Sequence, residues 1–323
     1  MPDAFPILYV AEADPTLAVL SSGVLFHLAE AVPNARITVV GSPASAPLFA
    51  DLPGLERLLV LDRERRLEWL RLWAQVRDRR WGLVVDMRGT TLSARLKRRR
   101  RAVRLTPEPG EHAVQTAART LQMDETPRPR LAFGPETLAA ADALIGRDEG
   151  PILAVAPGAD WIGKVWPAER FAKVASRLLE PGGPMAGGRL MIVGDDVDRD
   201  GLQAVRMAST ARRTIAVLDR LTPLQTAAAL SRADLYLGND SLWTQLAVAA
   251  GTPTVALFGP SDDAVRGPWG EVTVRGPRTI EEYRAIDPRL DQEIQHLMDL
   301  PADRVFLSAV KRLERGRQPR PVT

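Results

Sequence analysis

The residue whose type and position best suit ligand chemistry is a lysine between a strand and a helix. Lys164 follows the apolar run Ile152–Ala156 and precedes Pro167, and proline is favoured at the first position of a helix. Gly158 and Gly163 let the intervening backbone approach a ligand closely. An ammonium group beside the amides of a helix N-terminus forms a cradle for phosphate. An ordinary loop with a surface lysine has the same spacing, so both interpretations stay open.

A second strand-to-helix junction carries an aspartate and a serine. Asp240 and Ser241 follow the apolar run Leu235–Gly238 and open an expected helix. Either side chain can cap that helix, and the amides there also favour an anion such as a diphosphate. Capping alone accounts for both residues. Their value lies in their position, because they lie at the carboxyl end of a strand, as Lys164 does at the end of another.

The remaining polar clusters leave their chemistry open. Asp195, Asp196 and Asp198 follow the strand expected at Arg189–Val193. Carboxylates there can hold a divalent metal, bond ribose hydroxyls or cap a helix. The histidines are too scattered for a metal cluster: they are His27, His112 and His296. Since the chain has no cysteine, disulfides, thiolate metal sites and cysteine nucleophiles are excluded.

Basic residues concentrate in one short segment. The formal net charge is only +3, yet seven of the ten residues from Arg95 to Arg104 are basic. A solvated helix end has this composition, and so does a docking surface for anionic lipid headgroups, phosphorylated glycan or nucleic acid. Interleaved aromatic residues are missing, which lowers the nucleic-acid option. The arginine-rich usage reflects either planar recognition of phosphate or the base composition of the genome.

Length and patterning predict two α/β domains. At 323 residues the chain exceeds the usual size of one core. Short β-branched runs alternate with amphipathic stretches, which predicts parallel sheets covered by helices. Prolines interrupt the pattern over 124–135, and we place the boundary near 148, giving domains over 1–148 and 149–300 and a terminal helix over 301–323. No apolar run is long enough to span a bilayer and no signal segment follows Met1, so we expect a cytoplasmic protein.

The expected elements place these polar residues at strand ends. Ligands of doubly wound sheets bind outside the carboxyl ends of the strands, here in a cleft between the two domains. Strands are expected at 7–10, 36–40, 58–61, 82–86, 152–156, 189–193, 214–217, 235–238 and 254–258. Helices are expected at 17–31, 67–79, 93–100, 111–122, 137–145, 167–179, 198–209, 221–231, 241–250 and 302–313.

Taken in order, these segments resemble the heptosyltransferase family, glycosyltransferase family 9. The resemblance covers nearly the whole chain and is strongest from residue 152 to 270. One family stretch is matched by Pro157-Gly158, Lys164, Trp166-Pro167 and Phe171. A second is matched by Asp240-Ser241, Leu246-Ala247, Ala249-Ala250-Gly251, Pro253, Val255–Gly259 and Gly267-Pro268. In the first half, Val85–Gly89 is similar to the family's strand end. The combination is specific, although no single motif is.

The resemblance implies the GT-B architecture, in which two Rossmann-like domains face a central cleft and the terminal helix packs back towards the first domain. It implies an inverting transfer of heptose or a related sugar from a nucleotide-diphosphate donor, ADP-linked, to lipopolysaccharide or another cell-surface glycan. No metal and no further cofactor are implied. Lys164 would contact the diphosphate, with Asp240 and Ser241 at the helix N-terminus. The remaining donor-site positions are Gly158, Asp198 at the ribose, Leu221 and Thr222 near the base, and Gln245.

The acceptor side is expected on the first domain. We expect Arg88, Arg98 and Arg99 to contact an anionic glycolipid or glycan acceptor. The basic run would also allow peripheral contact with the inner membrane face. Nucleic acid is not expected as a partner.

Four positions depart from the family pattern. The family carries a Gly-Asp pair after the first strand, whose aspartate is the general base, and an ungapped alignment places Thr16-Leu17 there. Leucine cannot abstract a proton, but Asp14 and Glu12 lie in the same loop and are our candidate catalytic residues, since a base need only reach hydrogen-bond distance. In the second motif, Leu242 replaces the expected glycine and Gln245 the expected histidine.

The departures keep a second function open: a catalytically inactive relative that binds a nucleotide or a glycan. Turnover of a donor separates that protein from an enzyme with a relocated base. A third and weaker option is a nucleic-acid binder that uses the arginine run, which salt-sensitive binding would reveal.

Overall fold

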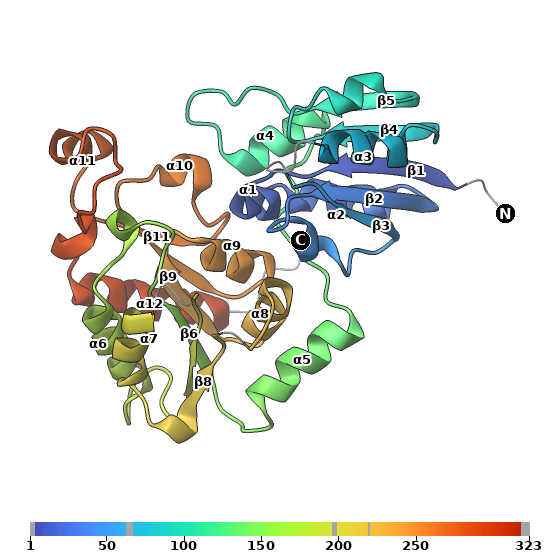
Figure 1. Ribbon diagram of the computed structural model, residues 1–323. Helices are drawn as coiled ribbons and strands as arrows, with labels where there is room; N and C mark the ends of the chain where they lie inside the picture. The colour runs from blue at the N-terminus through green and yellow to red at the C-terminus, as the bar shows by residue number, and fades with distance from the viewer. Residues whose placement is uncertain (1–3, 63–66, 196–198, 219, 318–323) are drawn as a thin grey trace. The chain divides into compact units, whose positions relative to one another are not determined.

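The computed structural model describes residues 4–62, 67–195, 199–218 and 220–317. The chain divides into two units, Met1–Gly134 and Pro135–Thr323 (Figure 1). The division precedes the predicted boundary near 148 because helix α5 (Pro135–Ile145) packs against α8 (Pro223–Leu230) and so belongs to the second unit. Within the described residues, no helix is both long and apolar enough to cross a membrane.

The first unit is a five-stranded parallel sheet with the order β3-β2-β1-β4-β5. Its core contains apolar side chains from the central strands, such as Leu8, Val10 and Val84. The strands are β1 (Phe5–Val10), β2 (Ala35–Gly41), β3 (Leu55–Val60), β4 (Trp81–Asp86) and β5 (Arg98–Val103). The helices are α1 (Pro15–Leu20), α2 (Ser22–Ala31), η1 (Ala46–Phe49), α3 (Glu68–Val76), η2 (Leu92–Arg95) and α4 (Ala113–Thr120).

The basic segment is a strand, whereas the sequence predicted a helix over 93–100. Only the short turn η2 is helical, and β5 pairs in parallel with β4 from Trp81↔Arg98 to Asp86↔Val103. An edge strand accommodates a run of arginines because alternate side chains point to opposite faces. The helix predicted over 17–31 is also interrupted: Ser21 ends α1 and precedes α2.

The second unit is a six-stranded parallel sheet with the order β11-β10-β9-β6-β7-β8. Helices α6, α7 and α12 lie on one face of this sheet, and α8 and α9 lie on the other (Figure 1). The strands are β6 (Ile152–Ala156), β7 (Arg189–Ile192), β8 (Thr214–Ala216), β9 (Leu235–Asn239), β10 (Thr254–Phe258) and β11 (Val272–Arg275). The helices, besides α5 and α8, are η3 (Ile162–Lys164), α6 (Ala168–Leu179), α7 (Arg199–Arg206), η5 (Ala211–Arg213), α9 (Leu242–Ala249), α10 (Asp263–Arg266), α11 (Ile280–Ile286), η6 (His296–Asp299) and α12 (Ala302–Arg317).

The last helix, α12, contributes to the core of the second unit through Val305, Ala309 and Leu313. The strand β11 and the helices α10 and α11 were not predicted, because their short segments carry little periodicity.

Both sheets reverse their winding direction beside a central strand. In the first unit the reversal lies between β1 and β4, and in the second it lies between β6 and β9. Loops that leave two such strands diverge to opposite faces of the sheet, which opens a crevice at the carboxyl ends. Each unit therefore has one place where polar loop residues can surround a ligand.

Candidate functional site

Lys164 forms a charge cluster at the reversal point of the second sheet. Its Nζ lies 3.0 Å from Oδ1 of Asp160 and 3.4 Å from Oδ2 of Asp240. The Asp240 side chain is only 7% exposed, whereas that of Asp160 is 74% exposed. Burial opposes the charge on Lys164, but the two carboxylates outweigh it and hold the pKa of Lys164 above its ordinary value. Lys164 is therefore cationic throughout the physiological pH range.

The loop that carries Lys164 is fastened to the neighbouring strand by one amide. Asn239, which is fully buried at the end of β9, donates through Nδ2 to the carbonyl oxygen of Pro157 (2.6 Å). Its Oδ1 accepts the backbone N–H of Trp166 (3.1 Å). One side chain thus holds both ends of the segment that contains Gly158 and Lys164. Sequence reasoning missed Asn239, although it directly precedes Asp240.

A tryptophan packs over the same loop. A Cβ atom added to Gly163 would lie 2.3 Å from the ring of Trp161, so only glycine allows this close approach. The indole Nε1 of Trp161 donates to the carbonyl oxygen of Gln292 (2.9 Å), and its ring meets that of His296 edge-on. The predicted close backbone approach at Gly163 therefore serves the packing of Trp161.

Asp240 directly precedes the N-cap Ser241 of α9, and both its backbone and its side chain are engaged within the unit. Its backbone N–H donates to the carbonyl oxygen of Leu257 (3.0 Å), so this amide belongs to the sheet and is not directed at a ligand. Its carboxylate would repel a diphosphate but attracts Lys164. Asp240 is thus the buried ion-pair partner of Lys164.

Ser241 occupies the N-cap position of α9, as predicted. Its side chain makes no cap hydrogen bond, so it leaves the first-turn amides of the helix uncapped. The half-buried Leu242 follows at the position where the resemblance expected glycine. Ser241, the start of α9 and the Lys164 ammonium group together present positive charge at one strand end.

Two further predicted donor residues are engaged in local structure. Thr222 caps α8, and its Oγ1 accepts the backbone N–H of Gln225 at 3.3 Å. Gln245 is fully buried in α9, where its Nε2 donates to the carbonyl oxygen of Arg266 (2.9 Å). The structure therefore places Gln245 within the packing of the unit.

The other predicted donor residues are placed less specifically. Gly158 is buried directly after β6, and Leu221 is half-buried before α8. Asp198 lies outside the described residues. Among the residues that the structure does describe, no three histidine, aspartate or glutamate side chains are grouped so that they could hold a metal ion.

Glu12 and Asp14 follow β1 at the reversal point of the first sheet. Asp14 caps α1, and its Oδ1 accepts the backbone N–H of Thr16 at 2.8 Å. Glu12 is 7% exposed and forms an ion pair with Arg104, whose Nη1 lies 2.8 Å from Glu12 Oε1. Burial raises the pKa of Glu12 above its ordinary value, although Arg104 opposes the shift. Half-buried Leu17 lies within α1.

Arg104 and Asp86 complete this edge of the first sheet. Asp86, fully buried at the end of β4, accepts hydrogen bonds from the N–H and Oγ1 of Thr90 (2.9 and 2.8 Å) and from the N–H of Arg88 (3.2 Å). These hydrogen bonds fix the loop that follows β4. The charge on Arg88 also lowers the pKa of Glu12, so Arg88 lies near this carboxylate. Arg104 was part of the basic run, but its pairing with Glu12 was not predicted.

The structure separates Arg98 and Arg99 from Arg88. They begin β5, whereas Arg88 follows the carboxyl end of β4. Arg98 donates through Nη1 to the carbonyl oxygens of Ala94 and Leu96 (3.0 and 2.7 Å), and Arg99 is exposed. The predicted acceptor arginines therefore do not form one cluster.

The chain is similar to known proteins in both sequence and fold. The profile of glycosyltransferase family 9 (heptosyltransferase) matches residues 72–282. Lipopolysaccharide heptosyltransferase 1 of Pseudomonas aeruginosa is 28% identical over 237 residues, which cover 65% of this chain and 63% of that protein. The match thus spans less than two thirds of the relative's length.

Solved structures share the fold. The crystal structure of a family 9 glycosyltransferase from Veillonella parvula DSM 2008 superposes with a TM-score of 0.77 at 20% identity, covering 97% of this chain and 98% of the other. The E. coli ADP-heptose lipopolysaccharide heptosyltransferase II has a TM-score of 0.74 at 16% identity, with 97% and 100% coverage. Together with two all-parallel sheets, this likeness confirms the predicted GT-B fold class.

Proposed function

The chain belongs to glycosyltransferase family 9, and from that premise we propose that it transfers a heptose or related sugar from an ADP-linked donor to a lipopolysaccharide or other cell-surface glycan. The observation that carries the proposal is the Lys164–Asp240 pair at the reversal point of the second sheet, beside the start of α9. A similar protein is named for ADP-heptose, which supports adenine as the donor base.

The second unit would bind the donor and stabilise its leaving group. Negative charge develops on the diphosphate as the bond to the anomeric carbon breaks, and Lys164 supplies a fixed positive charge there. Ser241 and the first-turn amides of α9 add donors on the same side. Asp160, which is exposed, must release the ammonium group when the diphosphate arrives, whereas buried Asp240 keeps it in place. This role requires no metal or further cofactor.

The first unit would supply the base. The acceptor hydroxyl oxygen attacks the anomeric carbon from the side opposite the diphosphate, so the configuration inverts, and the hydroxyl proton passes to a carboxylate. We favour Glu12 over Asp14 because the Asp14 carboxylate is engaged as a helix cap. Burial gives Glu12 a raised pKa, which makes it a stronger proton acceptor than an ordinary glutamate.

An anionic bilayer surface is the proposed location of the acceptor. Helix α3 exposes Leu70 at 62%, and Leu67 before it is exposed at 59%. Trp69 and Trp73 line a groove of about 310 Å³ beside this face, together with Arg95. Tryptophan, leucine and arginine in one surface suit the interface of an anionic bilayer. The protein would then be cytoplasmic with peripheral contact at the inner membrane, and nucleic acid is not a proposed partner.

Donor binding and turnover test the proposal together. ADP, GDP, UDP and dTDP and their sugars are screened by thermal shift, and the stabilising sugar nucleotide is then offered with glycolipid acceptors. We expect selective stabilisation by the ADP series and release of ADP that depends on the acceptor. Binding without turnover across the panel would favour the inactive relative, which the replacement of the family's aspartate by Leu17 and of its histidine by Gln245 predicts. Absence of any nucleotide binding would contradict both functions.

A further inference from the structure

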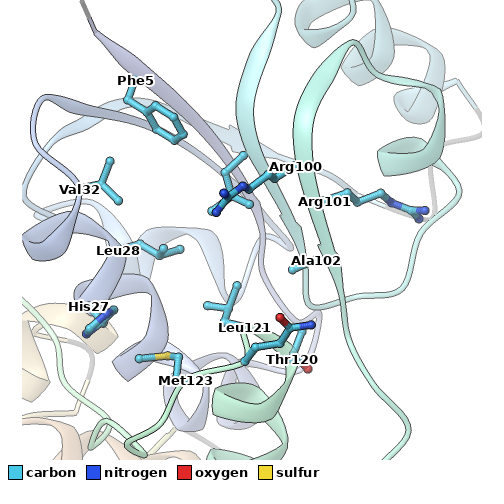
Figure 2. A pocket seen from close by; sticks show the side chains of 12 residues that line it. Phe5, His27, Leu28, Val32, Arg100, Arg101, Ala102, Thr120, Leu121 and Met123 are labelled. Carbon is cyan, nitrogen blue, oxygen red and sulfur yellow. The ribbon is translucent and has the colours of Figure 1, made fainter. Parts of the chain in front are cut away.

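The first unit contains a second cavity, on the face of the sheet that α2 and α4 cover. It has a volume of about 380 Å³, which lies within the range of small-molecule sites. Its lining comes from β1, α2, β4, β5 and the turn after α4. The lining residues are Phe5, His27, Leu28, Val32, Leu83, Arg100, Arg101, Ala102, Thr120, Leu121, Gln122 and Met123 (Figure 2).

The cavity lies away from the reaction edge described above. Phe5 is the first residue of β1, whereas Glu12 follows the last. At about 3.3 Å per residue of strand, the two ends are roughly 20 Å apart. The cavity exists because α4 ends at Thr120 after eight residues and leaves Leu83 and Ala102 of the sheet half-buried. A ligand here is therefore not the sugar donor.

One guanidinium group gives the cavity its charge. Figure 2 shows the Arg100 side chain extending between Phe5 and Leu28, whereas Arg101 points away from the cavity. Arg101 is held elsewhere, because its Nε and Nη2 donate to Ser93 Oγ (3.0 and 2.8 Å). None of the twelve described lining residues is acidic. The charge of Arg100 is thus uncompensated within the lining.

The walls around Arg100 are apolar. Phe5, Leu28, Val32, Leu83, Leu121 and Met123 supply them. The ring of Phe5 rests on the backbone of Gly82, where an added Cβ would approach it to 2.6 Å. A flat guanidinium group above an apolar floor matches a carboxylate or phosphate attached to a hydrocarbon body.

The turn after α4 is built in a conformation that favours glycine. Gln122 has φ = 54°, and the N–H of Met123 donates to the carbonyl oxygen of Ala118 (3.1 Å), which closes a helix-ending Schellman turn. Glycine is the usual residue at that position because a side chain is strained there. The chain nevertheless places a glutamine there, whose amide-bearing side chain lines the cavity. Residues that are held in such rare backbone conformations cluster at ligand sites.

We propose that this cavity binds an amphipathic anion, a single alkyl chain with a carboxylate or phosphate head, with Arg100 on the head and the apolar walls on the chain. Gln122, which lines the same cavity, adds an amide group to its wall. The inference is independent of the sugar-transfer reaction, since it uses none of the residues assigned to donor or base.

Calorimetry with decanoate and decyl phosphate, below their micelle concentrations, tests the proposal on the full chain. We expect saturable binding of one molecule per chain for at least one of the two, and the preferred head identifies its class. Affinity should rise roughly threefold to fourfold per methylene along the alkyl series until the cavity is full. Decanol and acetate, which each lack one half of the ligand, should bind at least tenfold more weakly.

Three variants connect binding to the cavity. Arg100→Gln should lower affinity at least tenfold, whereas Arg99→Gln, the matched arginine on the same strand outside the lining, should leave it unchanged. Ala102→Phe should block the cavity. Gln122→Gly relieves the strained turn, so it should melt at or above the wild-type temperature and still bind less tightly; this variant separates ligand contact from misfolding.

Several results would overturn the proposal. One is that neither probe binds saturably. Another is that decanol binds as tightly as decanoate, which would leave only an apolar hole. A third is that Arg99→Gln weakens binding as much as Arg100→Gln. Loss of binding to phosphatidylglycerol vesicles in Arg100→Gln without any binding of the soluble probes would assign Arg100 to a membrane surface instead.

Discussion

The two sheets reverse their winding in the same way, but the central ionisable group at the reversal point is an acid in the first unit and an amine in the second. In the first unit, three carboxylates (Glu12, Asp14 and Asp86) gather there, with arginine charges beside them. In the second unit, one lysine lies between two carboxylates beside the start of a helix. The first arrangement raises the pKa of a buried acid, and the second keeps a buried amine charged.

Under the proposed function, one topology would supply the two halves of a group transfer. A parallel sheet only determines that loops diverge beside a central strand. Which side chain is buried there would then determine whether the site accepts a proton or stabilises an anion. Substitutions at the two sites should therefore separate turnover from nucleotide binding.

The largest expected effect is on turnover in Glu12→Gln. Removing a general base lowers the rate by roughly 10²- to 10⁴-fold, while ADP affinity should stay unchanged because the donor is held by the other unit. Steady-state kinetics and calorimetry measure the two quantities. Asp14→Asn is the matched variant, and a larger loss there than in Glu12→Gln would move the base to Asp14.

Lys164→Ala should weaken ADP binding by roughly 10- to 100-fold, since charge-assisted contacts contribute about 1.5–3 kcal/mol. Lys173→Ala, which removes an exposed lysine of α6, is the matched control. Calorimetry measures both. Equal affinity in the wild type and Lys164→Ala would remove the electrostatic basis of the proposed donor site.

Leu70→Glu should reduce binding to anionic vesicles by about tenfold, because apolar area and positive charge both contribute to interfacial binding. Leu307→Glu changes a leucine with a similar exposure, 57%, on α12 of the second unit. Vesicle co-sedimentation compares the two variants. If both lose binding equally, α3 has no special role at the membrane.

The pH dependence of kcat/KM should report the environment of Glu12. The base acts when deprotonated, so activity falls as the pH drops through a pKa above the ordinary glutamate value of about 4.3. Arg104 lowers that pKa, so Arg104→Gln should move the acid limb to still higher pH. If the acid limb stays at the same pH in Arg104→Gln, it does not report the ionisation of Glu12.

The smallest expected effect is a gain. Asp160→Asn removes the exposed anion that competes with a diphosphate for Lys164, and exposed ion pairs contribute about 0.2–1 kcal/mol. ADP should therefore bind up to roughly fivefold more tightly. Weaker binding in this variant would show that Asp160 assists the ligand instead of competing with it.

The sequence predicted well those strands whose residues are apolar. Ile152–Ala156 and Thr254–Phe258 match β6 and β10 in full, because buried parallel strands are continuous hydrophobic runs. The strand β5 was missed because its first four residues and the preceding Lys97 are all basic, and only pairing with β4 makes that segment a strand. Periodicity carries no information about such pairing.

The candidate sites were predictable in position but only partly in role. Strand ends identified Lys164 and Ser241, since carboxyl ends of parallel strands are where ligands bind. Glu12 was proposed because it lies in the loop where the family resemblance expects an aspartate. The pairing of Glu12 with Arg104 joins residues far apart in the chain, and no local pattern indicates it. Likewise, only the sheet shows that the Asp240 amide is occupied by Leu257.

Asn239 converts the segment from Pro157 to Trp166 into a closed ring, since one buried side chain bonds both of its ends. A tethered ring has few conformations left to lose, so an arriving nucleotide would spend little of its interaction energy on ordering the backbone. Affinity at this place should therefore depend on a residue that never touches the ligand.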